Sequence, residues 1–150
     1  KTIAENTTMA SLEKFVKGIC INRKSEEATA QDYVERLNTK TPTVNTPTLS
    51  LSGGNQQKVV IAKWLVRDCD ILIFDEPTRG IDVGAKSEIY HLMNELAASG
   101  KSIIMISSEL PEILRMSDRI MVMCEGKKTA EIPIEEASQE VIMQAATVGM

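Results

Sequence analysis

The sequence has few aromatic residues, a single histidine and only three cysteines among its 150 residues. Aromatic residues make up 3% of the chain, so there is no platform on which successive nucleic-acid bases could stack. Cys20, Cys69 and Cys124 are odd in number, far apart and without a Cys-x-x-Cys pair, which argues against a disulfide framework or a zinc site. This cysteine usage fits a reducing cytosol better than an oxidising compartment.

Long apolar runs and a basic charge balance are also missing. No apolar run approaches the roughly 18 residues that a membrane span needs, so any membrane role is expected to be peripheral. The net charge of −4 argues against a nucleic-acid surface, which needs clustered Lys and Arg side chains. The first residues contain neither a starting Met nor a signal peptide, so we expect a piece of a longer protein.

Residues 1–50 predict helices followed by a loop. Apolar residues recur at loosely helical spacing from Thr2 to Val16, and Ser25 is expected to cap a second helix. Residues 39–48 contain five threonines and two prolines, a composition typical of a linker because proline lacks a backbone N–H.

Beyond residue 50, helices and strands alternate. Helices are predicted at residues 55–67, 83–99 and 138–147, with a short one starting near Pro111. Apolar runs predict three strands, at residues 71–74, 102–106 and 120–123, followed by a short polar strand. The first two runs are expected to be buried, the first of them on both faces. The alternation predicts an α/β fold with a mainly parallel sheet flanked by helices.

The segment Ser52-Gly53-Gly54, just before a predicted helix, indicates an anion site. Glycines allow close approach of the backbone to a ligand, and the helix start directs unpaired N–H groups toward it. Ser52 adds a hydroxyl donor. A flexible turn is the alternative for these three residues alone. The side-chain amides of residues 55–57 and the acidic residues at the end of the next predicted strand favour a phosphate site over that alternative.

Asp75 and Glu76 follow the apolar run 71–74 directly. Adjacent strand residues point to opposite faces, so the two carboxylates can take different roles. One can hold Mg²⁺ through its water shell, and the other can activate a water for attack on a phosphate. A polar strand end that leads into a turn is the alternative.

Two further polar residues have structural interpretations. Gly100-Lys101-Ser102 looks like the end of a P-loop, but it follows a helix and opens a strand, with Glu95 in place of the first glycine. We therefore predict a helix-end glycine and lysine. The only histidine, His91, lies in the middle of a predicted helix, where no metal-ligand cluster or catalytic triad can be assembled around it.

Three segments together resemble the nucleotide-binding domain of ABC transporters. Leu51 to Gln57 resembles the signature motif, Ile71 to Glu76 the Walker B motif, and Gly80 to Asp82 the D-loop. Longer strings are similar to the second half of the fused ATPase subunits of bacterial ribose- and galactose-type importers: residues 51–59, 75–86 and 106–112. The resemblance covers nearly the whole chain. It implies a P-loop NTPase-like fold, with a helical subdomain at residues 1–50 and the C-terminal part of the catalytic core at residues 51–150.

The resemblance also implies roles for single residues. Asp75 would hold Mg²⁺ and Glu76 would be the catalytic carboxylate of this domain's own ATP site. Ser108 stands where the family has its switch histidine, so hydrolysis at that site is in question. The ATP of a partner domain would meet the signature residues Ser52, Gly53, Gly54 and Gln56, with Asp82 facing the partner and capping a helix. This implies an asymmetric pair in which the signature completes the active site.

The implied partners are a second nucleotide-binding domain, in the same polypeptide or a dimer mate, and a transmembrane permease. A periplasmic or extracellular sugar-binding protein is implied indirectly, and nucleic acid is not. The chain itself would lie as a peripheral protein at the cytoplasmic face of a bacterial cell membrane. The Walker A and Q-loop motifs do not occur in this sequence, so neither ATP nor Mg²⁺ is expected to bind it tightly in isolation.

The implied function is ATP hydrolysis that drives monosaccharide import, and two alternatives stay open. A non-transport ABC-type ATPase would be expected to carry long coiled coils or basic arms, which the sequence does not show. A non-catalytic half that supplies only its signature is favoured by Ser108 and opposed by Glu76.

Overall fold

The computed structural model describes residues 1–147. The chain forms two compact units, one of residues 1–72 with 77–104 and one of residues 73–76 with those from 105 onward. Within the described residues, none of the helices combines the length and the apolar character that crossing a bilayer requires. The subdivision at residue 50 remains a prediction from the family resemblance.

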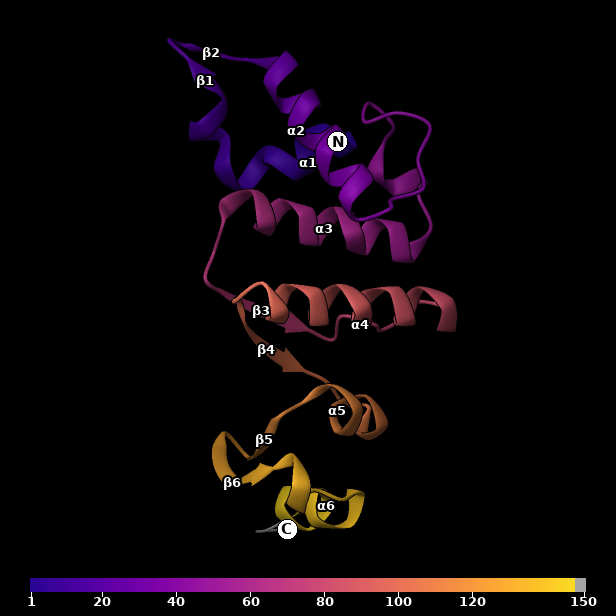
Figure 1. The fold of residues 1–150 in the computed structure, drawn as a ribbon, viewed down its shortest axis with the longest axis vertical. Coiled ribbons are helices and arrows are strands. Elements are labelled where there is room, and N and C mark those ends of the chain that lie inside the picture. The colour runs from indigo at the N-terminus through magenta and orange to yellow at the C-terminus, as the bar shows by residue number, and fades with distance from the viewer. Residues whose placement is uncertain (148–150) are drawn as a thin grey trace. The chain divides into compact units, whose positions relative to one another are not determined.

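The first unit is mainly helical (Figure 1). Its elements are α1 (Ile3–Thr8), the 3-10 helix η1 (Met9–Phe15), β1 (Val16–Lys17), β2 (Cys20–Ile21), α2 (Arg23–Arg36), η2 (Thr48–Ser50), α3 (Gly53–Arg67) and α4 (Val83–Ala98). The strands β3 (Ile71–Asp75) and β4 (Ser102–Ile106) have residues in both units. The second unit adds α5 (Leu110–Met116), β5 (Arg119–Cys124), β6 (Lys127–Pro133), η3 (Ile134–Glu136) and α6 (Gln139–Ala146).

The helical prediction for the N-terminal region is right in kind and wrong in extent. The helix from Thr2 stops after α1, because Ser11 leaves the helical region at φ −141° and the chain turns into the β1–β2 hairpin. The predicted cap at Ser25 is also wrong. Asn22 begins α2, because its side chain accepts a hydrogen bond from the Ser25 backbone N–H.

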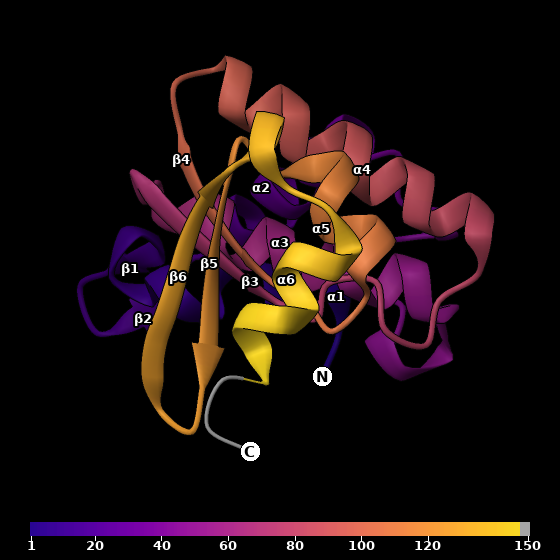
Figure 2. The same ribbon diagram turned by 90° about the horizontal axis from the view of Figure 1, so that it is seen from below.

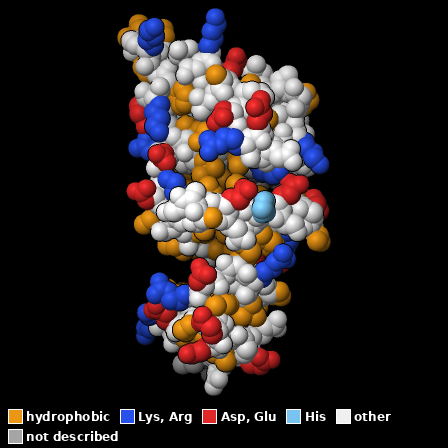
Figure 3. Space-filling view, viewed as in Figure 1, with side chains coloured by type: hydrophobic (Ala, Val, Ile, Leu, Met, Phe, Trp, Pro, Cys, Tyr) orange, Lys and Arg blue, Asp and Glu red, His pale blue; other side chains and the backbone are white. Residues whose placement is uncertain are grey.

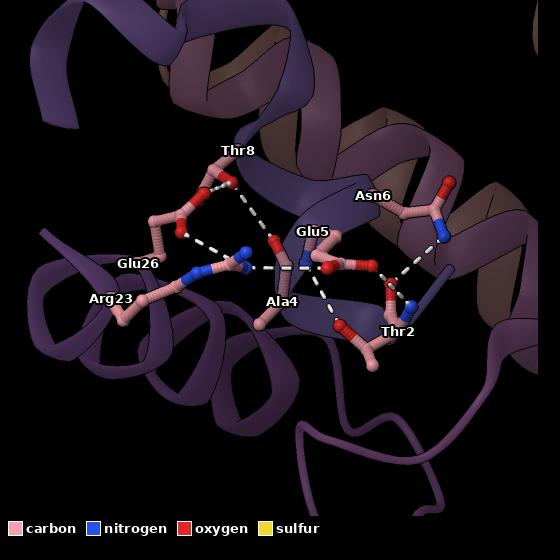
Figure 4. A network of polar contacts seen from close by, with 7 residues as sticks. All are labelled: Thr2, Ala4, Glu5, Asn6, Thr8, Arg23 and Glu26. Carbon is pink, nitrogen blue, oxygen red and sulfur yellow. Dashed lines mark hydrogen bonds and ion pairs between the residues drawn. The ribbon is translucent and has the colours of Figure 1, made fainter. Parts of the chain in front are cut away.

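A polar network joins α1 to α2 (Figure 4). Thr2 and Glu5 form a reciprocal capping box, and Arg23 of α2 pairs with Glu5 at 3.2 Å. The Thr2 backbone N–H and the Arg23 guanidinium both lower the pKa of Glu5. Thr8 donates its hydroxyl hydrogen to the buried Glu26 at 2.6 Å. Because a helix of six residues is not stable alone, these contacts to α2 help to hold α1 in place.

A buried lysine connects α3 to α4 and to the turn after α2. Lys58 of α3 is 5% exposed, and its ammonium donates to the Asn38 carbonyl at 2.9 Å and pairs with Glu88 of α4 at 2.7 Å. A buried charge that lost such partners would be strongly destabilising. The pair therefore fixes α3 beside α4, and Figure 1 shows these helices running side by side.

The strands β3 and β4 pair in parallel. The Ser102 N–H donates to the Asp70 carbonyl where both strands begin, and the Glu76 N–H donates to the Ile106 carbonyl where both end. The expectation that these strands are buried is wrong for the described chain. Burial alternates along β3, where Ile71 and Ile73 are 60% and 65% exposed. The residues of β4 are exposed or half-buried.

The third predicted strand does not extend this parallel pair. In the described residues, β5 pairs with β6 in an antiparallel hairpin, which lies beside α6 in Figure 2. Four buried residues form the core of this part: Ile120, Val122, Ile132 and Ile142. The hairpin forms because residues 125–126 make a tight turn, with both at positive φ.

The helix-end interpretation of Gly100 and Lys101 is confirmed. Gly100 follows the α4 C-cap with φ +93°, a conformation that suits glycine. The Lys101 ammonium contacts Asp68, the C-cap of α3, at 2.8 Å. This hydrogen bond and the charge of Lys101 lower the pKa of Asp68, and Asp68 in turn raises the pKa of Lys101. Lys101 is thus a partner in a structural ion pair.

Candidate functional site

The start of α3 presents a set of unused hydrogen-bond donors. Ser52 is the N-cap, and the first helical hydrogen bond runs from the Gln56 N–H to the Ser52 carbonyl at 2.9 Å. Within residues 1–147, the N–H groups of Gly53, Gly54 and Asn55 donate to no protein acceptor. Such N–H groups, with the positive end of the helix dipole, suit a phosphate oxygen.

A cavity of about 220 Å³ opens beside these donors. Ser52 and Gly54 line it together with Asp82, so the signature and the D-loop meet there. Asp82 caps α4 by accepting a hydrogen bond from the Ala85 N–H at 3.0 Å, as its position predicted. The part of α3 that carries the signature is therefore seated against the start of α4.

Two predicted signature contacts lie outside this cavity. Gly53 is not among the lining residues, and Gln56 uses its amide internally, donating to the Leu51 carbonyl at 2.8 Å. Lys40 and Glu88 line the cavity instead, and the sequence interpretation missed both. Lys40 stands in the Thr- and Pro-rich loop, where no local pattern marks it as part of a site.

Gly54 of the signature has a packing role that the sequence did not predict. Gly53 and Gly54 are both helical, so neither uses a conformation closed to other residues. An added Cβ at Gly54 would lie 2.7 Å from the Cβ of Ala85 in α4, whereas one at Gly53 would meet its nearest atom at 3.4 Å. Gly54 is needed for the close approach of α3 to α4.

The acidic pair sits at the end of β3. Asp75 is the last strand residue and its side chain is exposed. Glu76 adopts φ +47°, so it has left the strand, and the alternation argument for its direction does not apply. Its carboxylate instead turns toward the end of β4, where the Ser108 N–H donates to Glu76 Oε1 at 3.0 Å. Ser108 thus meets Glu76 through its backbone.

The segment after β4 is itself held in place. The Ser107 hydroxyl donates to Glu112 of α5 and accepts a hydrogen bond from the Glu109 N–H. These bonds fix the turn that presents the Ser108 N–H to Glu76. The carboxylate therefore has a defined position in the second unit.

Each of the two donor sets, taken by itself, suits one part of a complex between a nucleotide and Mg²⁺. Three free N–H groups and a hydroxyl suit phosphate oxygens, and a carboxylate at a strand end suits Mg²⁺, which takes few protein ligands and keeps its waters and substrate phosphates. Within the described residues, no group of three His, Cys, Asp and Glu side chains forms a metal cluster. On the face shown in Figure 3, Lys and Arg mingle with Asp and Glu.

Known proteins resemble this chain in sequence. The profile of the family described as ABC transporter matches residues 1–79. A Burkholderia lata protein named for import of ribose, galactose and methyl galactoside is 60% identical over 146 residues, and the xylose import ATP-binding protein of Thermoanaerobacter pseudethanolicus is 57% identical over 147. These matches include 97% and 98% of this chain, which spans only 28% and 29% of the relatives' lengths.

Solved structures share the fold. An ATP-binding cassette of an ABC transporter superposes with a TM-score of 0.78 at 24% identity, over 96% of this chain and 62% of the other. A dimeric bacterial ABC transporter cassette gives 0.73 at 24% identity, over 89% and 57%. The predicted α/β fold of the P-loop NTPase type is thereby confirmed.

Proposed function

Because the chain belongs to the ABC transporter family of ATP-binding proteins, we propose that it is part of a subunit whose ATP hydrolysis drives monosaccharide import through a membrane permease. The observation that carries the proposal is the set of unpaired N–H groups beside Ser52 in a cavity shared with the D-loop. The names of the relatives, which refer to ribose, galactose and xylose import, support a sugar as the cargo. Such a subunit would work at the cytoplasmic face of the membrane against its permease, with a sugar-binding protein on the opposite side of the membrane.

The signature serves the ATP of a second nucleotide-binding domain in this proposal. The Ser52 hydroxyl and the N–H groups of residues 53–55 would donate to its terminal phosphate, where negative charge gathers during transfer. Asp82 keeps the D-loop beside these donors by capping α4. ATP and Mg²⁺ supply the transferable phosphoryl group and its charge neutralisation.

The domain's own Asp75 and Glu76 would serve a second site. Asp75, exposed at the end of β3, would hold Mg²⁺ through water. Glu76 would accept a proton from the attacking water through its carboxylate, which the Ser108 N–H already orients. Ser108 offers no imidazole, so the proposal includes an asymmetric pair in which this second site turns over slowly.

A direct test reconstitutes the full-length subunit with its permease and binding protein in proteoliposomes. Uptake of labelled ribose, galactose or xylose should require ATP on the side of the membrane that carries the subunit. A non-hydrolysable ATP analogue on that side should support no uptake. ATP hydrolysis without uptake of any monosaccharide would leave an ATPase and remove sugar transport from the proposal. Absence of hydrolysis would remove both.

One observation favours a second candidate, a half that supplies only its signature. The Glu76 carboxylate is already engaged by the Ser108 N–H, and the imidazole of the family's switch position is replaced by a hydroxyl. Glu76→Gln is therefore expected to leave most of the steady-state ATP hydrolysis of the reconstituted subunit. Near-complete loss of activity in Glu76→Gln would mean that the local site turns over and that the pair is not asymmetric.

A further inference from the structure

We propose that Asn55 is a positioning residue that fixes the Ser52 hydroxyl as a donor toward phosphate. The proposal rests on the proposed function, since it concerns how the signature presents its hydroxyl to the partner's nucleotide. It assigns the Asn55 side chain to Ser52 and not to the nucleotide.

The orientation of the Asn55 amide follows from its neighbours. The Lys40 backbone N–H, which can only donate, lies 2.8 Å from Asn55 Oδ1. The atom that faces this N–H must be the amide oxygen, because an amide nitrogen cannot accept. The Nδ2 group is then the one that points at Ser52, where it lies 2.8 Å from Oγ.

This contact sets the polarity of the Ser52 hydroxyl. An amide Nδ2 only donates, so Ser52 Oγ must accept from Asn55, and its own hydrogen has to point elsewhere. Ser52 makes no side-chain cap bond to a helix N–H, the use to which an N-cap serine is ordinarily put. The Asn55 backbone N–H therefore also remains available beside the hydroxyl hydrogen.

The donor that holds Asn55 is itself fixed. Lys40 follows Thr39, whose N–H donates to the Val34 carbonyl of α2 at 2.8 Å. One residue earlier, the Asn38 carbonyl accepts from the buried Lys58 ammonium at 2.9 Å. The chain from Asn38 to Lys40 is thus anchored on α2 and α3, and it keeps the Lys40 N–H on Asn55 while a ligand enters or leaves.

The test measures ATP hydrolysis by the full-length subunit with its permease, as kcat and KM. Asn55→Asp has the same shape and can still accept from Lys40, but it presents an acceptor to Ser52 and so turns the hydroxyl hydrogen away from phosphate. It is expected to lower kcat/KM for ATP about tenfold to hundredfold. Asn45→Asp, at an exposed loop position, makes the same charge change and should leave kcat/KM unaltered.

The same substitution in a second variant distinguishes the positioning role of Asn55 from a structural or purely electrostatic role. In a Ser52→Ala subunit, Asn55→Asp should lower kcat/KM by no more than about twofold, because no hydroxyl remains to be turned. Asn55→Ala serves as an uncharged second variant, and its smaller loss should vanish in the same way. The proposal would be overturned if Asn55→Asp lowered kcat/KM as much in the Ser52→Ala subunit as in the subunit with Ser52. It would also be overturned if Asn55→Asp had no effect on kcat/KM when Ser52 is present.

The failure of this inference differs from a failure of the proposed function. If Ser52→Arg leaves ATP hydrolysis intact, the signature does not serve an ATP site and the proposed function fails. If Ser52→Arg abolishes hydrolysis while the effects of Ser52→Ala and Asn55→Asp simply add, only the positioning role of Asn55 is lost.

Discussion

Ser52→Arg should reduce ATP hydrolysis by the full-length subunit with its permease by about a hundredfold to a thousandfold, as loss of a preorganised donor to a reacting oxyanion typically does. The substitution removes the hydroxyl and places a long side chain in the cavity of about 220 Å³ that Ser52 lines. Arginine would bring a positive charge. Its long side chain would, however, fill the space that the phosphate needs, so the charge could not replace the lost hydroxyl. The measurement is the steady-state release of inorganic phosphate.

Ser99→Arg provides the matched control for size and charge. Ser99 is the exposed C-cap of α4, and its hydroxyl contacts only the Leu96 carbonyl of the same helix in the described structure. Its rate should remain close to that of the unmodified subunit. Equal rates for Ser52→Arg and Ser99→Arg would show that the start of α3 takes no part in hydrolysis.

Gly54→Ala should destabilise the fold by about 1–3 kcal/mol, the usual range for an overpacked contact. The added methyl would lie 2.7 Å from the Ala85 Cβ, and neither atom is the far end of a flexible side chain that could move aside. The start of α3 and the start of α4 would have to separate, which would also widen the cavity shared by Ser52 and Asp82. Urea unfolding of the subunit, compared at equal m-values, measures the change.

Gly53→Ala makes the same chemical change one position earlier. There the new methyl would meet its nearest atom, Ile81 Cγ2, at an ordinary 3.4 Å, and alanine is the better helix former by up to about 1 kcal/mol. The two substitutions should therefore shift the free energy of unfolding in opposite directions. Equal effects would mean that Gly54 is not a packing glycine.

Local sequence patterns predicted the fold class and three of the residues that line the cavity, Ser52, Gly54 and Asp82. Ser52 and Asp82 were placed by motif and by capping rules that depend on neighbours in sequence, and the structure brings both to one cavity. The contact between Lys40 and Asn55 could not be predicted from neighbours in sequence. Their hydrogen bond joins a loop to a helix fifteen residues later, and only the folding of that loop over α3 creates it.

The errors have equally specific causes. The alternation of side-chain direction along a strand was assumed to continue to Glu76. The backbone instead turns to φ +47° at that residue, and a periodic pattern cannot reveal a change at a single residue. The apolar runs of β3 and β4 correctly marked strands and incorrectly implied burial. Apolar character says that a face is suited to contact, whereas burial also depends on which elements lie against it.

The left-handed backbone at Glu76 has an evolutionary consequence. A residue with a side chain costs roughly 1–3 kcal/mol in such a conformation, and glycine avoids most of that cost. Selection for thermal stability alone would thus favour Glu76→Gly in a pool of random variants, and the carboxylate would be lost with it. A glutamate at this position thus costs stability that a glycine would restore, and its retention would be favoured only where the carboxylate has a use.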